Sequence, residues 1–427
     1  MRSNAHVSKP DTSSTDGGAP VQTADMPAWS AWLDDAGVDG MVRAFAAILT
    51  GEARSRSELS SLLKVRSTTV SAWVAAMVRA QLVVELQRKP GGRGRPLVEL
   101  AANPDRLAAS VLMVHSQSLH IATVNLQGQR LWHESVALPS SAGNADMRRA
   151  LRALQSRAAA ALSADTQLVG VIYSLSGLVS TANARWLFAS RWPGIKNLSL
   201  RDCTSPAQTA MHVVRNMDAQ LQARYLRKEQ VGEDRRTLLL HWGYGIGMTF
   251  GPVTDTAARS TNGFGEVGHW QLPGQRLTCR CGRVGCLETV AALWAIGPRL
   301  LGRRFDDAMD EVQAAELLQG MALTNHAVFE RALQEVVRVL VNLCRLFFPT
   351  EVVVSGPFIE NAQAWAALNQ AFAAQDLLVD LPMPRLERQR AGHKLEQEGA
   401  AMPVLMNGLN DMLLRAAQAD ASVRAAR

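Results

Sequence analysis

The chain has 427 residues, of which 47% are hydrophobic and 19% charged, and its formal net charge is +7. This length predicts two or three domains, and the composition excludes a chain that is disordered throughout. Five cysteines are too few for a disulfide scaffold, and the sequence has no run of about 18 or more uncharged apolar residues that would indicate a membrane-spanning helix.

The first 40 residues differ in composition from the rest of the chain. They are rich in Ser, Thr, Asp, Gly and Pro, and they carry two basic against six acidic residues. They contain no apolar run of the kind that forms the centre of a signal peptide. We therefore expect a flexible leader over residues 1–40 and a cytoplasmic protein with no membrane partner.

Positive charge is concentrated between residues 41 and 100, which hold ten Lys or Arg against four Asp or Glu. This density suggests an acidic partner, with nucleic acid as the first candidate. Apolar spacing predicts a helix over 41–49, a short helix from an N-cap at Ser57 to Leu63, and a second helix capped by Ser67 or Thr68. The expected buried stripe of the second helix comprises Val70, Trp73, Val74, Met77 and Val78. Two short helices joined by a tight turn are typical of a helix-turn-helix domain.

The residues predicted to contact DNA open the second helix and occupy the turn after it. At the helix start they are Arg66, Ser67, Thr68, Thr69 and Ser71. The segment "LVVELQRKPGGRGRPLVEL" then predicts a strand, a turn and a strand, forming a wing whose Arg93 and Arg95 suit a narrow minor groove. Alternatively, the hydroxyl residues only cap the helix and the basic hairpin is simply solvated. Helix pair, wing and charge together favour a winged helix-turn-helix over residues 41–100 that binds double-stranded DNA.

Three of the five cysteines lie in "GHWQLPGQRLTCRCGRVGC", together with a histidine. Thiolate and imidazole are preferred zinc ligands, and four protein ligands close a tetrahedral structural site. The predicted ligands are His269, Cys279, Cys281 and Cys286, and Gly282 and Gly285 let the loop fold back on itself. A redox pair or three inert buried thiols are alternatives, but neither explains the glycines or the histidine.

This stretch also carries a family resemblance. The pattern Glu-x-Gly-His followed by Cys-x-Cys-Gly-x-x-Gly-Cys-x-Glu ends at Glu288 and resembles the signature of the ROK family of repressors, uncharacterised reading frames and sugar kinases. The resemblance spans roughly residues 41 to 415. It implies a mixed α/β fold, with an N-terminal winged helix-turn-helix followed over 101–427 by a two-lobe, actin-like or ribonuclease-H-like domain. The zinc loop of that domain would cover residues 268–288.

The resemblance further implies a sugar-binding role for several residues. Those that match the family's sugar contacts are Glu266, His269, Glu288, Asn216 and Gly177. Carboxylates can accept paired hydrogen bonds from neighbouring hydroxyls, and a histidine can bind zinc through one ring nitrogen while the other faces a ligand. For the two glutamates, the alternative is a role in orienting the loop without touching the ligand.

Three parts of the family's phosphoryl-transfer machinery are altered in this sequence. His115, Ser116 and Gln117 stand where the resemblance implies an Asp-x-Gly phosphate turn, and Tyr244 replaces a small hydroxyl residue in the second turn. Met217 follows Asn216 where the family has the aspartate that acts as base, and a thioether cannot accept a proton. These changes predict a domain without enzymatic activity.

Towards the C-terminus, "RALQEVVRVLVNLCRLFFPTEVVVSGPF" predicts an amphipathic helix that leads into a buried strand. The stretch 377–402 predicts a surface strand and a loop before a final helix.

These features together predict a transcriptional regulator, most simply a repressor of carbohydrate genes. Its partners would be a DNA operator and a sugar or sugar phosphate effector, and a homodimer or homotetramer would bring two winged helices to one operator. Two alternatives remain open from the sequence. One is an active ATP-dependent ROK sugar kinase, and the other is an interaction protein that has lost its effector.

Overall fold

The computed structural model describes residues 39–87, 98–204, 210–227, 236–251, 265–378, 381–390 and 392–425, with side chains up to residue 419. The expected leader, apart from its last two residues, lies outside these ranges, as do Arg93 and Arg95 of the predicted wing. Within the described part of the chain, no helix is both long and apolar enough to cross a membrane.

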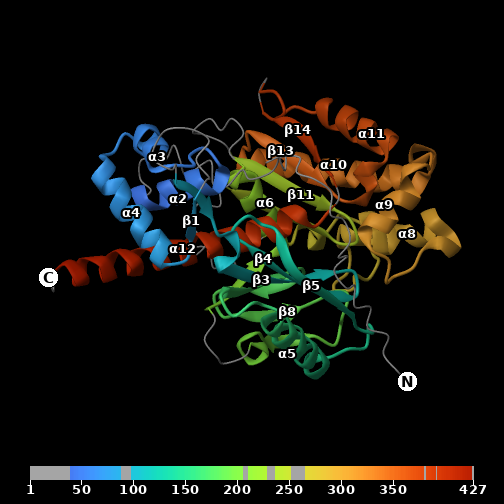
Figure 1. The fold of residues 1–427 in the computed structure, drawn as a ribbon. Coiled ribbons are helices and arrows are strands. Elements are labelled where there is room, and N and C mark those ends of the chain that lie inside the picture. Colours follow the sequence, from blue (N-terminus) through green and yellow to red (C-terminus); the bar gives the residue numbers. More distant parts are fainter. Residues whose placement is uncertain are drawn as a thin grey trace.

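A module of three helices and a hairpin forms the N-terminal end of the described chain (Figure 1, blue). Its elements are α2 (Gly40–Thr50), α3 (Arg56–Leu63), α4 (Ser67–Arg79), β1 (Val83–Gln87) and β2 (Val98–Ala102). β1 and β2 pair antiparallel. The helices and strands predicted here are therefore present, and Val70, Val74 and Met77 of the expected stripe are fully buried. Trp73 and Val78 pack against the same core but stay partly exposed.

The helix starts of this module differ in detail from the prediction. α3 begins at Arg56, because the hydroxyl of Ser55, rather than that of Ser57, accepts a hydrogen bond from the backbone N–H of Glu58. The Glu58 carboxylate in turn accepts one from the N–H of Arg54, at 2.6 Å. α4 begins at Ser67, and its N-cap position is Arg66, which makes no capping bond through its side chain. Ser67 and Thr68 are consequently not N-caps but exposed residues of the first turn.

The first lobe is built on a five-stranded sheet of order β10-β6-β3-β4-β5 (Figure 1). Its strands are β3 (Leu107–His115), β4 (Ser118–Asn125), β5 (Arg130–Ala137), β6 (Gln167–Leu175) and β10 (Ala210–Arg215). β4 runs antiparallel to its two neighbours, β3 and β5, whereas β6 and β10 continue the sheet in parallel with β3. Helix α5 (Asn144–Ala160) and a small sheet of β7 (Leu178–Ser180), β8 (Arg185–Phe188) and β9 (Lys196–Ser199) complete the lobe.

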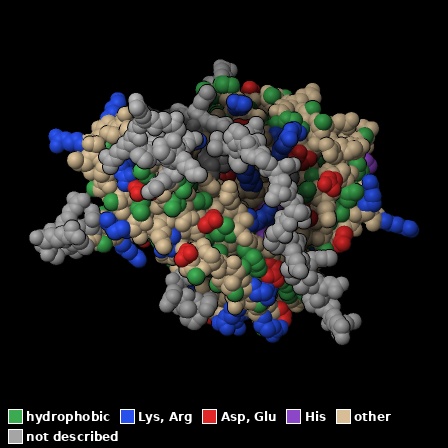
Figure 2. Space-filling view, viewed as in Figure 1, with side chains coloured by type: hydrophobic (Ala, Val, Ile, Leu, Met, Phe, Trp, Pro, Cys, Tyr) green, Lys and Arg blue, Asp and Glu red, His purple; other side chains and the backbone are tan. Residues whose placement is uncertain are grey.

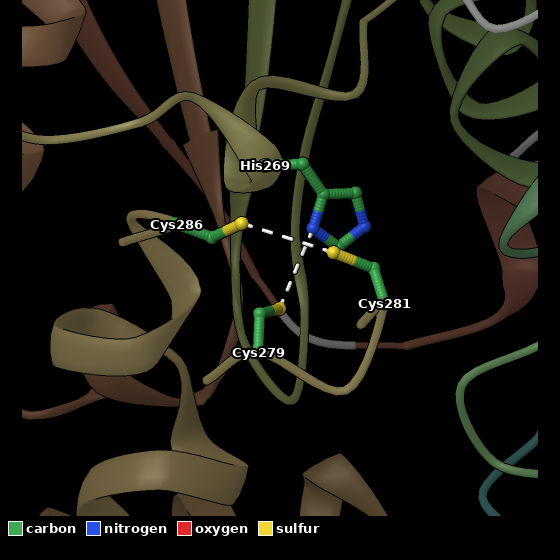
Figure 3. A group of neighbouring side chains, drawn as sticks. All are labelled: His269, Cys279, Cys281 and Cys286. Carbon is green, nitrogen blue, oxygen red and sulfur yellow. Dashed lines mark hydrogen bonds between the residues drawn. The ribbon is translucent and has the colours of Figure 1, made fainter. Parts of the chain in front are cut away.

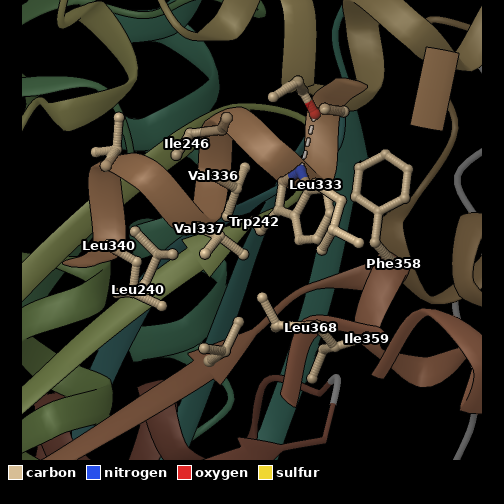
Figure 4. Close-up of a cluster of buried hydrophobic side chains, with 14 of the residues drawn as sticks. Leu240, Trp242, Ile246, Leu333, Val336, Val337, Leu340, Phe358, Ile359 and Leu368 are labelled. Atoms are coloured by element: carbon tan, nitrogen blue, oxygen red, sulfur yellow. Dashed lines mark hydrogen bonds between the residues drawn. The ribbon is translucent and has the colours of Figure 1, made fainter. Parts of the chain in front are cut away.

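The second lobe holds a four-stranded sheet of order β12-β11-β13-β14. Its strands are β11 (Thr237–Trp242), β12 (Ile246–Gly251), β13 (Glu351–Ser355) and β14 (Arg385–Gln389), and α6 (Asn216–Leu226) leads into it from β10. The helices are α7 (Glu288–Ala291), α8 (Leu293–Leu301), α9 (Glu311–Gln319), α10 (Ala327–Phe347) and α11 (Ala362–Ala373). The predicted helix and buried strand near residue 340 are thus α10 and β13. Figure 4 shows side chains of α10, including Leu333, Val336 and Leu340, in one apolar cluster with Trp242 and Phe358.

The chain ends in a helix of 32 residues, α12 (Lys394–Ala425), which runs from between the lobes to the N-terminal module (Figure 1, red). Its side chains Leu405, Leu409 and Leu413 belong to the same buried cluster as Val70 and Val74 of α4. The prediction that residues up to 402 form a strand and a loop is wrong from Lys394 onward, where the helix already begins. One apolar core therefore joins the N-terminal module to the first lobe.

Candidate ligand cleft and metal centre

A cavity of about 210 Å³ lies between the two lobes. The first lobe contributes the ends of β3 and β6 and the small sheet, and the second lobe contributes the turn between β11 and β12 and the start of α9. All five residues predicted from the resemblance to contact a sugar border this cavity: Gly177, Asn216, Glu266, His269 and Glu288. They come from four separate parts of the chain, which the fold brings to one place.

Beside the cavity, the four predicted zinc ligands form one cluster (Figure 3). Their ligand atoms all lie within 4.8 Å of one another. The Cys279 sulfur is 3.7 Å from Nδ1 of His269, and the sulfurs of Cys281 and Cys286 are 3.8 Å apart. The structure therefore confirms a Cys₃His grouping that could hold a metal ion.

Local backbone geometry explains how this loop brings its side chains together. Gly282 and Gly285 have positive φ values of 87° and 85°, which glycine adopts without steric penalty. Two antiparallel bridges, Gln271 with Cys286 and Thr278 with Val284, fold the loop back on itself. The glycines thus have the chain-reversing role predicted for them.

The donor set fits zinc in number and in kind. Three sulfurs and one imidazole nitrogen suit Zn²⁺, and four protein ligands leave no position for a reactive water. The two ring nitrogens of His269 face different ways: Nδ1 lies towards Cys279, and Nε2 lies 4.0 Å from Oε2 of Glu266, on the side of the cavity. An ion bound here would therefore orient a ring that also borders the cleft.

The two glutamates near the cluster are in different situations. Glu288 is 7% exposed; its Oε1 accepts a hydrogen bond from the N–H of Ile246 at 3.0 Å, and its Oε2 accepts one from the Trp294 indole at 3.2 Å. Glu266 is less constrained, with its side chain 31% exposed. Burial raises the pKa of Glu266, and Arg215 opposes that effect. Glu266 is therefore the carboxylate more available to a ligand. Glu288 is held by its two hydrogen bonds and helps to fix the loop in place.

At the start of α6, Met217 rather than an acid faces the cavity. Asn216 is the first residue of the helix, as predicted, and both it and Met217 border the cavity. Asp218, the nearest carboxylate in sequence, accepts a hydrogen bond from the Thr249 hydroxyl at 2.6 Å and is not among the cavity-lining residues. Asp218, one residue beyond Met217, therefore does not supply a carboxylate to the cavity in its place.

Where the resemblance implies phosphate turns, the side chains contact one another and the opposite lobe. The guanidinium carbon of Arg191 lies 3.2 Å from the centre of the Tyr244 ring. Arg280 donates to the Tyr244 hydroxyl and, at 3.0 Å, to Asp307. From the first lobe, Arg191 and the hydroxyl of Ser116 donate to the backbone carbonyls of Asp307 and Ala308 of the second. These contacts hold the lobes together across the cleft.

A charged network at the second turn was missed by the sequence analysis. Nε2 of His241 lies 3.0 Å from Oε2 of Glu311, and its Nδ1 lies 3.1 Å from the Ser355 hydroxyl. Burial raises the pKa of Glu311, but the adjacent His241 and the N–H of Tyr244 outweigh it, and the pKa is about 2. Burial lowers the pKa of His241, but Glu311 outweighs it and the net shift is upward. Only the fold brings these residues together, so no local motif could have revealed them.

The predicted DNA-contacting residues of α4 are accessible. Arg66, Ser67, Thr68 and Ser71 are exposed, and Thr69 is partly exposed. Lys and Arg side chains project from the surface over α3 and α4 (Figure 2, left).

The described chain is a two-lobed α/β protein with a cavity between its lobes. Residues 116–403 match the ROK family model, and the chain belongs to the ROK family. The xylose repressor of Caldicellulosiruptor bescii is 26% identical over 326 residues, which cover 72% of this chain and 80% of that protein. The DNA-binding transcriptional repressor Mlc of Escherichia coli K12 is 23% identical over 72% of this chain and 78% of its own length.

Solved structures support the same fold. The crystal structure of a ROK family transcriptional regulator, a homologue of E. coli Mlc, matches with a TM-score of 0.64 at 21% identity. The match covers 88% of this chain and 98% of that one. ROK sugar kinases share the fold as well. The family resemblance and the mixed α/β fold predicted from the sequence are thereby confirmed.

Proposed function

We propose that this chain is a DNA-binding transcriptional repressor whose ROK domain senses a sugar or sugar phosphate. The observation that carries the proposal is that one apolar core connects the N-terminal module to the helix that begins at the cleft. The module with the exposed, basic start of α4 shares its apolar core with α12, and α12 begins at the floor of the ligand cleft. The names of the similar proteins, a xylose repressor and Mlc, agree with this role.

In this proposal, α2–α4 and the β1–β2 hairpin form a winged helix-turn-helix. The first turn of α4 enters the major groove, where Arg66, Ser67, Thr68, Thr69 and Ser71 contact phosphates and base edges. Arg93 and Arg95, outside the described residues, reach the minor groove from the wing. One such domain reads only half of a two-fold operator, so the active species is a homodimer or homotetramer.

The effector would bind among Glu266, His269 and Asn216, with Gly177 close by. Gly177 has a φ of 84°, and a β-carbon there would lie 2.4 Å from the Phe188 carbonyl oxygen, so the turn needs glycine. Zn²⁺ on the Cys₃His cluster would hold the loop that presents Glu266 and His269. Its role is structural, since the four ligands complete its shell.

Signalling would be a population shift between two lobe arrangements. A ligand changes the equilibrium only if it binds one arrangement more tightly than the other. The contacts of Arg191 and Ser116 with residues 307–308 stabilise the arrangement with the lobes together. A ligand that competes with them would move α12 and the winged helices attached to it, and so change the spacing of two DNA-reading domains.

The same site argues against phosphoryl transfer. By the family resemblance, Met217 stands where the family has its catalytic base, and Tyr244 stands in what would be a phosphate turn. Both residues border the cavity, and Arg191 and Arg280 lie over the Tyr244 ring. The test is ATP turnover over a panel of hexoses and pentoses, for the natural chain and for Met217→Asp. We expect none from either, because restoring the carboxylate leaves both phosphate turns altered. Turnover by the natural chain would establish a kinase. Turnover by the Met217→Asp variant alone would show that the two altered turns can still bind phosphate.

A further inference from the structure

A second cluster of potential metal ligands lies in the cleft, separate from the cysteines. It comprises His115 at the end of β3, His393 just before α12, and Glu396 in the first turn of α12. One ligand atom from each residue can be chosen so that all three lie within 4.8 Å of one another. All three residues border the cavity.

One buried nitrogen of this cluster has no hydrogen-bond partner within the described chain. His115 is 9% exposed, and its Nε2 has no hydrogen-bond partner within the described chain. That nitrogen lies 3.9 Å from Oε2 of Glu396, which is 3% exposed and whose other oxygen accepts a hydrogen bond from the Ser174 hydroxyl at 2.7 Å. A buried polar atom without a partner destabilises a fold, so it calls for an explanation such as an ion.

The two imidazoles of the cluster lie against each other. The ring of His393 stacks on the ring of His115, with centroids 3.3 Å apart. Nε2 of His393 also lies 3.9 Å from Asp310, the N-cap of α9 in the second lobe, which can orient the ring.

We propose that His115, His393 and Glu396 form a second metal site, which binds a divalent ion of the zinc class. Two imidazoles and one carboxylate suit Zn²⁺ and similar ions, and three protein ligands leave one position open to the cleft. Coordination by both rings requires the stacked imidazoles to rotate apart around the ion. Exposed His133 and partly exposed His120 lead in a row to His115, with ring centroids 5.9 and 4.5 Å apart, and provide an access route.

The site lies where the first lobe meets the start of α12, so a bound ion would link these two elements. It ties β3 of the first lobe to the first turn of α12, whose later residues Leu405 and Leu409 lie in the core of the N-terminal module. An ion bound there would fix where α12 begins. The metal site itself rests on geometry alone and does not depend on the proposed repressor function.

Metal stoichiometry tests the proposal. The full chain and its variants are dialysed against Zn²⁺, freed of loosely held ion, and analysed for zinc by mass spectrometry, with circular dichroism to verify folding. We expect about two ions per natural chain and about one in His393→Gln, Glu396→Gln and Cys281→Ser. The Glu396→Gln variant keeps the volume and the acceptor for Ser174. His326→Gln, at a partly exposed histidine outside both clusters, is the control and should keep both ions.

Cobalt(II) separates the two sites by spectrum. Bound to the cysteine cluster, it gives an intense thiolate charge-transfer band, which His393→Gln should keep and Cys281→Ser should lose. Bound to the second site, it should give only weak d–d bands, which His393→Gln should lose. One zinc per natural chain at saturation would overturn the proposal. A second zinc that survives both His393→Gln and Glu396→Gln in folded protein would do so as well.

Discussion

At the scale of single residues, the cysteine cluster is the feature that the sequence predicted most completely. The four candidate ligands lie close together in the chain, and their spacing and the glycines between them define the loop. Sequence reasoning works here because this loop is a local structure. Glu311, by contrast, is far in sequence from His241 and follows no motif, so its pairing with that histidine is visible only in the fold.

Replacing one cluster thiol tests the ligand assignment. Cys281→Ser should lose about one zinc equivalent and lower the thermal midpoint of unfolding, because three donors hold structural zinc weakly. Cys203→Ser is the matched control, since Cys203 lies in the first-lobe core, away from the cluster. Metal analysis and calorimetry provide the measurements. Unchanged zinc content in Cys281→Ser would refute Cys281 as a ligand.

The His241–Glu311 pair should make stability depend on pH. The folded-state pKa of His241 is raised, so its contribution is fully present below its unfolded value of 6.5 and is lost as the pH rises through the folded value. Glu311, with a pKa of about 2, stays ionised throughout this window. Glu311→Gln should therefore be less stable than the natural chain by about 1–3 kcal/mol near pH 6, and the gap should narrow at higher pH.

Thermal melts across this pH range provide the measurement, and Glu316→Gln, an exposed residue of the same helix, is the control. A gap between Glu311→Gln and the natural chain that stays constant with pH would show that His241 is not the titrating partner.

At the scale of elements, the helices with strong apolar periodicity were predicted well, whereas the start of α12 was not. Gly399 reads as a helix breaker in sequence, yet it lies within the helix. A β-carbon there would lie 1.8 Å from the Ala219 carbonyl oxygen of α6, so glycine permits the close approach of two helices. Tertiary packing overrides local propensity, and for this reason His393 and Glu396 escaped notice.

The exposed start of α4 is the element whose function is most directly testable. Arg66→Ala should weaken binding to operator and random DNA by a similar factor, and it should reduce the slope of log affinity against log salt by about 1. Arg149→Ala, an exposed arginine on α5 of the first lobe, should change neither. Anisotropy titrations at several salt concentrations give both quantities. An unaltered salt slope in Arg66→Ala would remove Arg66 from the DNA contacts.

At the scale of the whole molecule, the family and its mixed α/β fold followed from the sequence because motif and composition agreed. The physical connection between the cleft and the N-terminal module could not be predicted from the sequence, because it depends on α12, which crosses the molecule. Leu405, Leu409 and Leu413 place that helix in the same core as α4. In the proposed function, this shared core would couple ligand binding in the cleft to DNA binding by the N-terminal module.

The most direct test of a ligand-controlled repressor is fluorescence anisotropy of the full chain on its own upstream DNA, with sugars and sugar phosphates added one at a time. We predict saturable, sequence-specific binding that one compound shifts by about 5- to 150-fold, the usual range of coupling between two sites. Binding no tighter than to random DNA, or specific binding that no sugar alters, would contradict the proposed function.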